Sequence, residues 1–350
     1  MTISRTDFGR LPDGTAVHLF TLDNGTGLRV SVSTYGGIIT SVQTPDRDGT
    51  WGEVTLAFDS LEEYLAGHPF YGSLVGRVAN RISGGGFEID GTRYAVENNQ
   101  GTVHLHGGTG GFHTRLYRAE TEERDDALLL HLSRVSPDGE EGYPGNLTVT
   151  HTIGVTADNR LTMEFAAQTD APTVVNLTNH TYWNLGEPTI LDHDVQIHAD
   201  QYVEIENLVP TGNTPSVEGT PLNFREFKTV RRDFEDVLKM DINGFDHSMI
   251  IGGWKPDSST PREVARVRSH VTGREMVIRS TYRDVQFYSG NNLPGERGRN
   301  GSTLSGQEAL CLECQFSPDS PNRPEFPSIT LRPGERYYQL TEHHFGTFTS

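Results

Sequence analysis

Residues 16–42 read AVHLFTLDNGTGLRVSVSTYGGIITSV and contain three short runs rich in β-branched and aromatic side chains. The runs are Ala16–Leu22, Leu28–Ser33 and Ile38–Val42, and Asp23-Asn24-Gly25 stands between the first two. Val, Ile, Thr and Phe favour strands, and Asn-Gly pairs favour tight turns. The stretch therefore predicts an antiparallel meander of three strands.

The same pattern of short strand-like runs and turn residues continues along the chain. Closely spaced strands of this kind are typical of an all-β sandwich or barrel. A parallel α/β fold would need long amphipathic helices, and only Ser60–Ala66 and Phe234–Met240 resemble helices, both short. Further strands are expected at Ala127–Ser133, Leu147–Val155, Leu161–Thr169, Val195–Ile197, Arg262–Arg268, Glu275–Ser280 and Arg336–Thr341.

The length and charge of the chain limit its domain organisation and the kinds of partner that it can bind. No linker-like stretch or repeat divides the 350 residues, so we expect residues 1–350 to form a single domain. The chain has 29 Lys and Arg against 47 Asp and Glu, a formal charge of −18. Such a surface repels nucleic acid and anionic membranes.

No apolar stretch approaches the roughly 18 residues of a membrane span, and residues 1–20 lack a leader-like apolar run. We therefore expect a cytoplasmic protein.

The two cysteines, Cys311 and Cys314, have the C-x-x-C spacing of some metal and redox sites. They lie in a strand-like run, Ala309–Phe316, where residues three apart point to opposite faces and stand about 10 Å apart. That is too far for a disulfide. Two cysteines are also too few for a disulfide framework, which fits a reducing compartment.

Two Gly-containing clusters carry several polar side chains. In Gly76–Ile82, two Arg residues and an Asn could form an array of hydrogen-bond donors for hydroxyl groups, or a solvated turn. In His104-Leu105-His106-Gly107-Gly108, strand alternation would put the two histidines on one face. That pair could bind a metal, but no third ligand is evident nearby, and no phosphate-loop motif follows.

A third cluster, Asn176–Leu185, reads NLTNHTYWNL. Interpreted as a strand, it presents a row of polar or amphipathic side chains on one face: Asn176, Thr178, His180, Tyr182 and Asn184. Such a row would line a wet cleft. His180 is then the natural acid–base group near neutral pH, although a structural histidine remains an alternative.

Two further clusters contain carboxylates. Asn243–His247 includes Asp246 and by itself favours a turn. In the run Cys311–Phe316, Glu313 shares a face with Cys311 and Gln315. A carboxylate is unfavourable to bury without a partner or a purpose, and burial would raise its basicity; an edge strand with Glu313 in solvent is the alternative. Gln286 and Tyr288, on an expected strand Val285–Ser289, could face the same pocket.

In their order along the chain, these clusters resemble one family, the aldose 1-epimerases or galactose mutarotases. The resemblance extends over most of the sequence and rests on these segments: Gly76–Ile82, Leu105–Gly108, Glu141–Leu147, Asn179–Leu185, Leu208–Gly212, Phe245–His247, Gln286–Asn291, Leu312–Gln315 and Pro318–Asn322. The sequence departs from the family pattern at Cys314, where threonine is common, and at His151 and His343, where tyrosine is frequent.

The resemblance implies a large antiparallel β-sandwich of the galactose mutarotase-like supersandwich type, with a sugar cleft on one sheet and neither cofactor nor metal. It implies that His180 is the acid and Glu313 the base that interconvert α and β anomers of free hexoses such as galactose or glucose. The partner would be a small hexose, and the protein a monomer or homodimer. Residues expected to bind substrate are Asn80, Arg81, His106, Asp246 and Gln286 from the resemblance, and Tyr182 from its place beside His180.

Three other functions remain open at this stage. Asp246 and Glu313 could form the carboxyl pair of a glycoside hydrolase. The cleft could belong to a carbohydrate-binding protein without catalysis, although such a protein has no use for a buried glutamate opposite a histidine. A hexose-phosphate epimerase would need a basic pocket, for which the dense candidates are Arg225, Arg231 and Arg232.

Overall fold

The computed structural model describes residues 1–240, 242–256 and 258–349. It begins with the predicted meander, extended by one strand on each side into a five-stranded antiparallel sheet in the order β1-β2-β3-β4-β5. The outer strands were not predicted. β1 has few apolar residues and so lacks the alternating pattern of a half-buried strand, and β5 has only three residues. The bounds are β1 Thr2–Arg10, β2 Ala16–Asp23, β3 Arg29–Ser33, β4 Ile39–Pro45 and β5 Trp51–Glu53.

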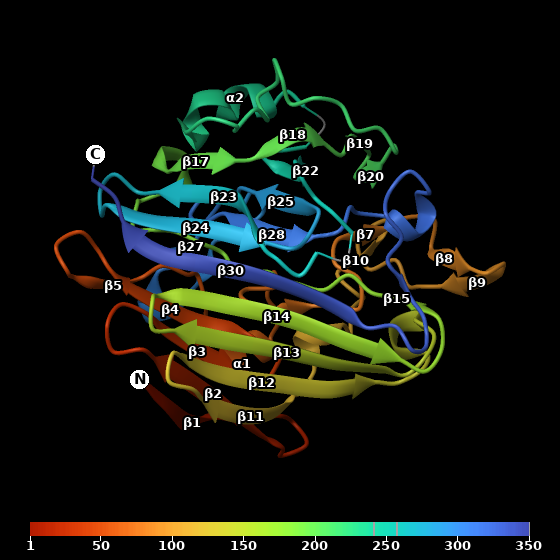
Figure 1. Cartoon of the computed structure of the whole chain (residues 1–350), viewed down its shortest axis with the longest axis horizontal. Coiled ribbons are helices and arrows are strands. Elements are labelled where there is room, and N and C mark those ends of the chain that lie inside the picture. Colours follow the sequence, from red (N-terminus) through yellow and green to blue (C-terminus); the bar gives the residue numbers. More distant parts are fainter. Residues whose placement is uncertain (241, 257, 350) are drawn as a thin grey trace.

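A nine-stranded antiparallel sheet runs across the front of the molecule in Figure 1, with the N-terminal strands behind its lower part. It contains the seven further strands predicted from the sequence, with ends that differ by a few residues. In spatial order its strands are β11 Arg118–Glu123, β12 Ala127–Ser136, β13 Leu147–Thr156, β14 Arg160–Thr169, β30 Tyr337–Thr347, β24 Arg274–Ser280, β23 Arg262–Arg268, β17 Asp194–Ile197 and β21 Lys228–Thr229.

A four-stranded antiparallel sheet forms the third layer, in the order β18-β22-β25-β28. Its strands are β18 Ala199–Tyr202, β22 Asp246–Ile251, β25 Asp284–Tyr288 and β28 Cys311–Gln315. Asp246, expected in a turn, is therefore the first residue of a strand. Each strand alternates between two faces. Val285, Phe287 and Leu312 face the main hydrophobic core, which leaves the opposite face free for polar side chains.

The three sheets share one main hydrophobic core. That cluster contains buried residues of the meander, such as Val30, of the nine-stranded sheet, such as Ile153, and of the four-stranded sheet, such as Phe287. This packing confirms the prediction of a large antiparallel β-sandwich. Cys314 belongs to this core, whereas Cys311 lies in a second cluster with Tyr182, so the two free thiols point to opposite faces as predicted.

Both predicted helices form, and both are short. α1 spans Leu61–Leu65 and begins at Ser60, whose hydroxyl accepts from the Glu63 N–H in a capping box. α2 spans only Phe234–Val237, after a 3₁₀ turn at Val230–Asp233. Among the described residues, no helix has the length and apolar character needed to cross a membrane.

The remaining elements are short and cover or connect the sheets. The strands are β6 Leu74–Val75, β7 Arg81–Ile82, β8 Gly86–Ile89, β9 Thr92–Ala95, β10 His104–Leu105, β15 Thr173–Val174, β16 Thr178–Asn179, β19 Ile205–Glu206, β20 Val209–Pro210, β26 Glu296–Arg297, β27 Thr303–Leu304 and β29 Thr330–Leu331. The other 3₁₀ turns are Phe112–Thr114, Glu140–Gly142, Ile190–Asp192, Arg299–Gly301 and Ser320–Asn322.

The interpretation of residues 176–185 as one strand is wrong, because only β16 within it is a strand. Its backbone changes partner almost every residue: the His180 N–H donates to Ser73 and the Trp183 N–H to Leu310. Its Asn and Thr side chains also bond to nearby backbone, as when Asn179 donates to the Gly72 carbonyl. Such side-chain bonds compete with a regular ladder. The two-face alternation therefore does not apply here.

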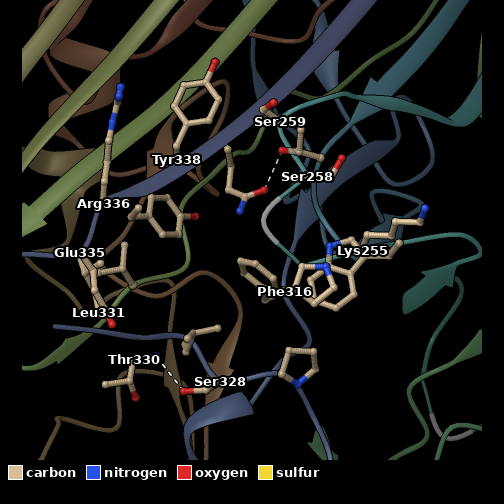
Figure 2. A pocket seen from close by; sticks show the side chains of 18 of the residues that line it. Lys255, Ser258, Ser259, Phe316, Ser328, Thr330, Leu331, Glu335, Arg336 and Tyr338 are labelled. Atoms are coloured by element: carbon tan, nitrogen blue, oxygen red, sulfur yellow. Dashed lines mark hydrogen bonds between the residues drawn. The ribbon is translucent and has the colours of Figure 1, made fainter.

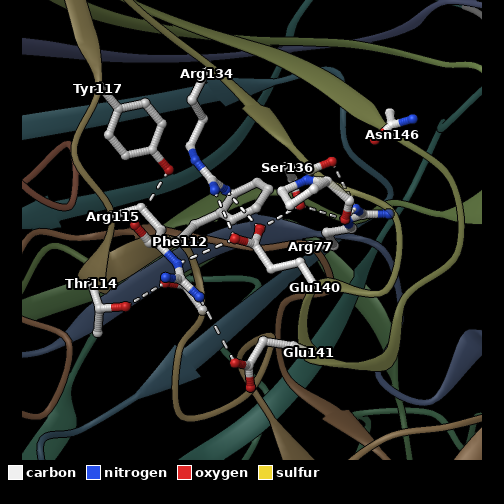
Figure 3. Close-up of polar contacts among 12 residues, drawn as sticks. Arg77, Phe112, Thr114, Arg115, Tyr117, Arg134, Ser136, Glu140, Glu141 and Asn146 are labelled. Carbon is white, nitrogen blue, oxygen red and sulfur yellow. Dashed lines mark hydrogen bonds and ion pairs between the residues drawn. The ribbon is translucent and has the colours of Figure 1, made fainter.

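Arg77 does not join a donor array for ligands, as the sequence allowed, but lies inside the protein. Its guanidinium donates to the Ser136 hydroxyl at 2.9 Å and to the carbonyls of Pro144 at 2.7 Å, Ser136 at 3.0 Å and Pro137 at 2.8 Å. Figure 3 places it beside Glu140, which accepts a bidentate ion pair from Arg134. Arg77 thereby fixes the segment that leads to Asn80 and Arg81.

We expect Arg77→Met to lower the free energy of unfolding by about 3 kcal/mol, because several buried carbonyls would lose a hydrogen-bond donor. Urea unfolding followed by circular dichroism measures the loss. Arg93→Met is a matched control, since the exposed Arg93 donates to a single carbonyl, that of Gly84. Equal midpoints for the two variants would contradict the structural role of Arg77.

Candidate active site

A cleft of about 160 Å³ opens on the polar face of the four-stranded sheet. All eight residues that the sequence analysis selected for catalysis or substrate binding line this cleft, although they are spread over more than 230 positions. They are Asn80, Arg81, His106, His180, Tyr182, Asp246, Gln286 and Glu313. The structure thus brings the whole predicted set together. Tyr288, which the sequence analysis expected to face the same pocket, also lines it, and the structure adds Pro69, Phe70, Gln100, Leu105 and Asn292.

The floor of the cleft is set by strand register. Gln286 on β25 pairs with Glu313 on β28 on one side and with Ser248 on β22 on the other. Gln286 donates to Asp246 at 2.6 Å, and Arg81 forms an ion pair with the same carboxylate at 3.4 Å. The Gln286 Oε1 atom is buried without a partner, so it is free to accept a hydrogen bond from a ligand.

One wall is built by two segments that lock each other. The His106 N–H donates to the Asn80 carbonyl at 2.9 Å, and the Asn80 N–H donates back to His106 Nδ1 at 3.2 Å. Both residues have positive φ, 62° for Asn80 and 52° for His106. This turn ends the alternation after Leu105, so His104 does not share a face with His106. His104 instead bonds to Tyr143 and the Glu97 carbonyl, and the possible His104–His106 metal pair is not formed.

His180 and Glu313 meet inside the cleft, with His180 Nε2 at 3.5 Å from Glu313 Oε1. They are only 5% and 2% exposed. Burial, reinforced by the nearby Asp246 charge, raises the pKa of Glu313 well above its usual range, and Arg81 opposes this shift. Burial also lowers the pKa of His180 to about 4, with Asp246 opposing. Although the pair has ion-pair geometry, both shifts favour its uncharged form.

Three neighbours hold His180 in place. Tyr182 stacks on its ring at 5.0 Å and 28°, while the Tyr182 hydroxyl donates to the Pro69 carbonyl at 3.0 Å. Phe70 lies on the ring at 5.8 Å, and Cys311 Sγ lies 3.5 Å from His180 Nδ1. Tyr182 therefore presents its ring to the cleft, since its hydroxyl is already bonded.

The residues that sequence reasoning missed come mainly from loops. Phe70 lies between His106 and His113, with ring centroids 4.6 Å from each, and has a φ of 63°. Gln100 accepts from Arg81 Nε at 3.1 Å and so holds the guanidinium. Phe70 lies in no polar cluster or alternating run, and Gln100 ends the polar run Glu97–Gln100, which the sequence analysis did not single out.

His106, His180 and Glu313 could also hold a metal ion by spacing, since their ligand atoms lie within 4.8 Å of one another. The tautomer of His106 argues against this. Its Nδ1 accepts from the Asn80 N–H, so in the neutral ring Nε2 carries the proton and acts as a donor. Burial lowers the pKa of His106 well below its usual range, which keeps the ring neutral. The arrangement suits a hydroxyl ligand better than a cation.

A larger hollow of about 1120 Å³ lies elsewhere, between the start of β30 and the segments around Trp254 and Ser328 (Figure 2). Its described lining contains no histidine. Among its charged groups, the Arg336 guanidinium lies over the Tyr338 ring at 5.3 Å. The buried His180–Glu313 pair lies in the smaller cleft and not in this hollow.

His151 and His343, which depart from the family pattern, lie in the core rather than in the cleft. His151 stacks on Phe165 at 4.6 Å, and His343 packs against Trp183 at 5.0 Å. Burial lowers their pKa values to about 4 and about 3. Both rings are therefore held neutral in the core.

Comparison with known proteins gives consistent matches over nearly the whole chain. The family described as aldose 1-epimerase matches residues 18–344. The galactose mutarotase of Bos taurus is 40% identical over 348 residues, covering 97% of this chain and 98% of the relative. The aldose 1-epimerase of Escherichia coli is 37% identical over 340 residues, covering 95% and 96%.

Solved structures agree with the sequence matches. A GalM/aldose epimerase homologue from C. elegans superposes with a TM-score of 0.86 at 29% identity, covering 94% of this chain and 98% of the other. A galactose 1-epimerase from Lactobacillus acidophilus gives a TM-score of 0.85 at 26% identity and 99% coverage of both chains. The resemblance inferred from the motifs is thereby confirmed, and the chain belongs to the aldose 1-epimerase family.

Proposed function

We propose that this protein is an aldose 1-epimerase, an isomerase that interconverts the α and β anomers of free hexoses such as galactose or glucose. The names and coverage of its relatives support this function. The buried His180–Glu313 pair supports it chemically, because anomer interconversion needs one group that donates a proton and one that accepts a proton at neighbouring atoms.

The reaction opens the pyranose ring, rotates about the C1–C2 bond and closes the ring again. In our proposal Glu313 takes the proton of the C1 hydroxyl while His180 gives a proton to the ring oxygen. The C1–O5 bond breaks and its electron pair stays on O5, which leaves an aldehyde at C1. On closure the two transfers reverse, so the enzyme returns to its starting state without any covalent intermediate.

The pair needs only one proton for this cycle. Burial places that proton on Glu313 in the free enzyme, since the Glu313 pKa is raised and the His180 pKa is lowered. A bound sugar reverses the preference, because its C1 hydroxyl donates to the carboxylate and its ring oxygen accepts from the imidazolium. The proton then crosses the 3.5 Å between Glu313 Oε1 and His180 Nε2. His180 as the acid and Glu313 as the base, the roles implied by the resemblance, are thus reached when the sugar binds.

The other polar side chains hold hydroxyl groups. Asp246 and the free Oε1 of Gln286 accept hydrogen bonds, while Arg81 and His106 Nε2 donate them. Tyr182 offers the face of its ring. Neutral or internally paired groups predominate here, which suits an uncharged hexose.

The alternatives have less support. The arginines considered for a phosphate group lie outside the cleft, where Arg231 pairs with Asp192 and Arg225 with Glu218, both at 2.7 Å. For glycoside hydrolysis, Asp246 would have to act from a site where Arg81 and Gln286 already engage it. A binding protein without catalysis gains nothing from the desolvated pair.

We further propose that residues 1–350 form one domain and that the protein is cytoplasmic. A monomeric or homodimeric state remains a prediction from the sequence.

We expect Glu313→Gln and His180→Asn each to lower the rate of mutarotation by about 10²- to 10⁴-fold, since each removes one of the two proton transfers. The double variant should be barely slower than either single variant, because the two groups act as a unit. Polarimetry of freshly dissolved α-D-galactose measures the rates. Glu122→Gln and His131→Asn are matched controls, since this Glu–His pair at 3.2 Å lies outside the cleft. Near-normal turnover in folded Glu313→Gln would refute the mechanism.

The dependence of kcat/KM on pH should follow the proton count of the pair. As pH falls through about 4, the pKa of His180, this histidine takes up a proton while Glu313 is still protonated. The pair then holds two protons, and kcat/KM falls. As pH rises through the raised pKa of Glu313, the single proton is lost and the rate falls again. Rates corrected for spontaneous mutarotation should therefore stay level between these limits. An acid limb near pH 6.5, the ordinary value for histidine, would contradict the account.

Arg81→Ala and Asp246→Asn should weaken sugar binding by about 1–3 kcal/mol, or roughly 5- to 150-fold, because each leaves a hydroxyl or a cleft group without its partner. The effect should appear mainly in KM for galactose. Asp233→Asn provides a comparison, since Asp233 pairs with Lys228 away from the cleft. Unchanged kinetics in both cleft variants would mean that the sugar binds elsewhere.

A further inference from the structure

A small β-hairpin stands beside the cleft and takes no part in the proposed chemistry. It consists of β19, β20 and the two turn residues Asn207 and Leu208 between them. The Glu204 carboxylate anchors its base by accepting from Thr211 and Asn213, both at 2.8 Å. The hairpin is therefore held firmly at the base, and its tip is fixed by the turn.

The tip has an unusual residue for its conformation. Asn207 and Leu208 have φ values of 51° and 68°, the pattern of a two-residue hairpin turn that favours Asn-Gly. Asn207 suits its position, but a leucine with positive φ is strained. Leu208 is also 37% exposed, so burial does not compensate for the strain. Strained side chains held in this way tend to occur at functional sites.

Leu208 lies next to the groups that hold the sugar. It lines a small hollow together with Arg81, Asp246 and Gln286, which also line the main cleft. Ile205 and Pro210 of the same hairpin and Pro318 complete an apolar rim. The hairpin therefore closes the cleft on the side of β22.

The proposed chemistry orients the sugar relative to this rim. O5 and C1 must lie at His180 and Glu313, the latter on β28. Gln286 on β25 and Asp246 on β22 lie progressively farther across the sheet. In a pyranose ring C3 and C4 lie opposite O5 and C1. The C3–C4 edge of the sugar therefore points toward Asp246 and the hairpin, whereas C6 leaves the ring from C5, beside O5.

We propose that Leu208 is a specificity-determining residue that restricts the cleft to sugars without a substituent at the C3–C4 edge. Free hexoses fit beneath the hairpin tip, and reducing disaccharides linked through O4 meet the Leu208 side chain. Disaccharides linked through O6 extend from another edge and avoid it. This inference rests on the proposed mutarotase activity.

Lactose and melibiose provide a matched pair of probes, because both join galactose to a reducing glucose, through O4 and O6 respectively. Leu208→Gly removes the side chain and also gives the turn the residue that its conformation favours, so the variant should fold. We expect it to raise the ratio of kcat/KM for lactose to that for melibiose by about tenfold, as for relief of a modest steric clash. Leu208→Ala should change the ratio in the same direction. Leu238→Ala is the control, since Leu238 is equally exposed, at 39%, and does not line the cleft.

Polarimetry of wild-type protein with glucose tests the proposed activity separately. If glucose mutarotates and the lactose-to-melibiose ratio stays the same in both Leu208 variants, the inference is wrong. It is also wrong if wild-type protein accepts lactose as well as melibiose, or if both disaccharides improve equally, which would indicate general loosening of the cleft.

Discussion

The burial of one carboxyl group and one imidazole at 3.5 Å from each other is the constraint on which the rest of the site depends. In water such a pair would be ionised and weakly coupled. Inside the cleft, loss of hydration raises the pKa of Glu313 and lowers that of His180, so that the pair holds a single proton without a full charge on either partner. In the proposed mechanism a neutral sugar enters without displacing a counterion, and its own atoms then favour separation of charge at the two positions where protons move.

The fold positions these two side chains in different ways, Glu313 on a regular β-strand and His180 on an irregular segment. Glu313 and Gln286 stand on neighbouring strands whose antiparallel register fixes their spacing. His180 comes from a segment whose backbone changes partner repeatedly, and Tyr182 of the same segment stacks on the histidine. The strained turns at Phe70, Asn80 and His106 complete the wall. Rigid strands position Glu313, the proposed base, and the locked loops aim the remaining groups at the same small volume.

Much of this could be predicted from the sequence, for reasons that differ between its parts. The strands at Ala16–Leu22 and Arg262–Arg268 were found because alternation and turn residues are local signals. Seven of the eight cleft residues were found because polar clusters and their order resemble one family, and Tyr182 was found from its place beside His180. The backbone path of residues 176–185 could not be predicted, since its hydrogen bonds depend on partners far away in the sequence. Nor could the sequence indicate that Arg77 is internal, or which of Glu313 and His180 holds the proton, because both depend on burial.

Exchange NMR of galactose at anomeric equilibrium tests the central claim most directly, because it detects interconversion without any net change in composition. With wild-type protein the account predicts exchange peaks between the α and β anomeric protons that grow with enzyme concentration. Methyl galactoside, which has no C1 hydroxyl proton for Glu313 to remove, should show no exchange and release no methanol. Anomers that exchange no faster than in buffer, or hydrolysis of the glycoside, would contradict the account.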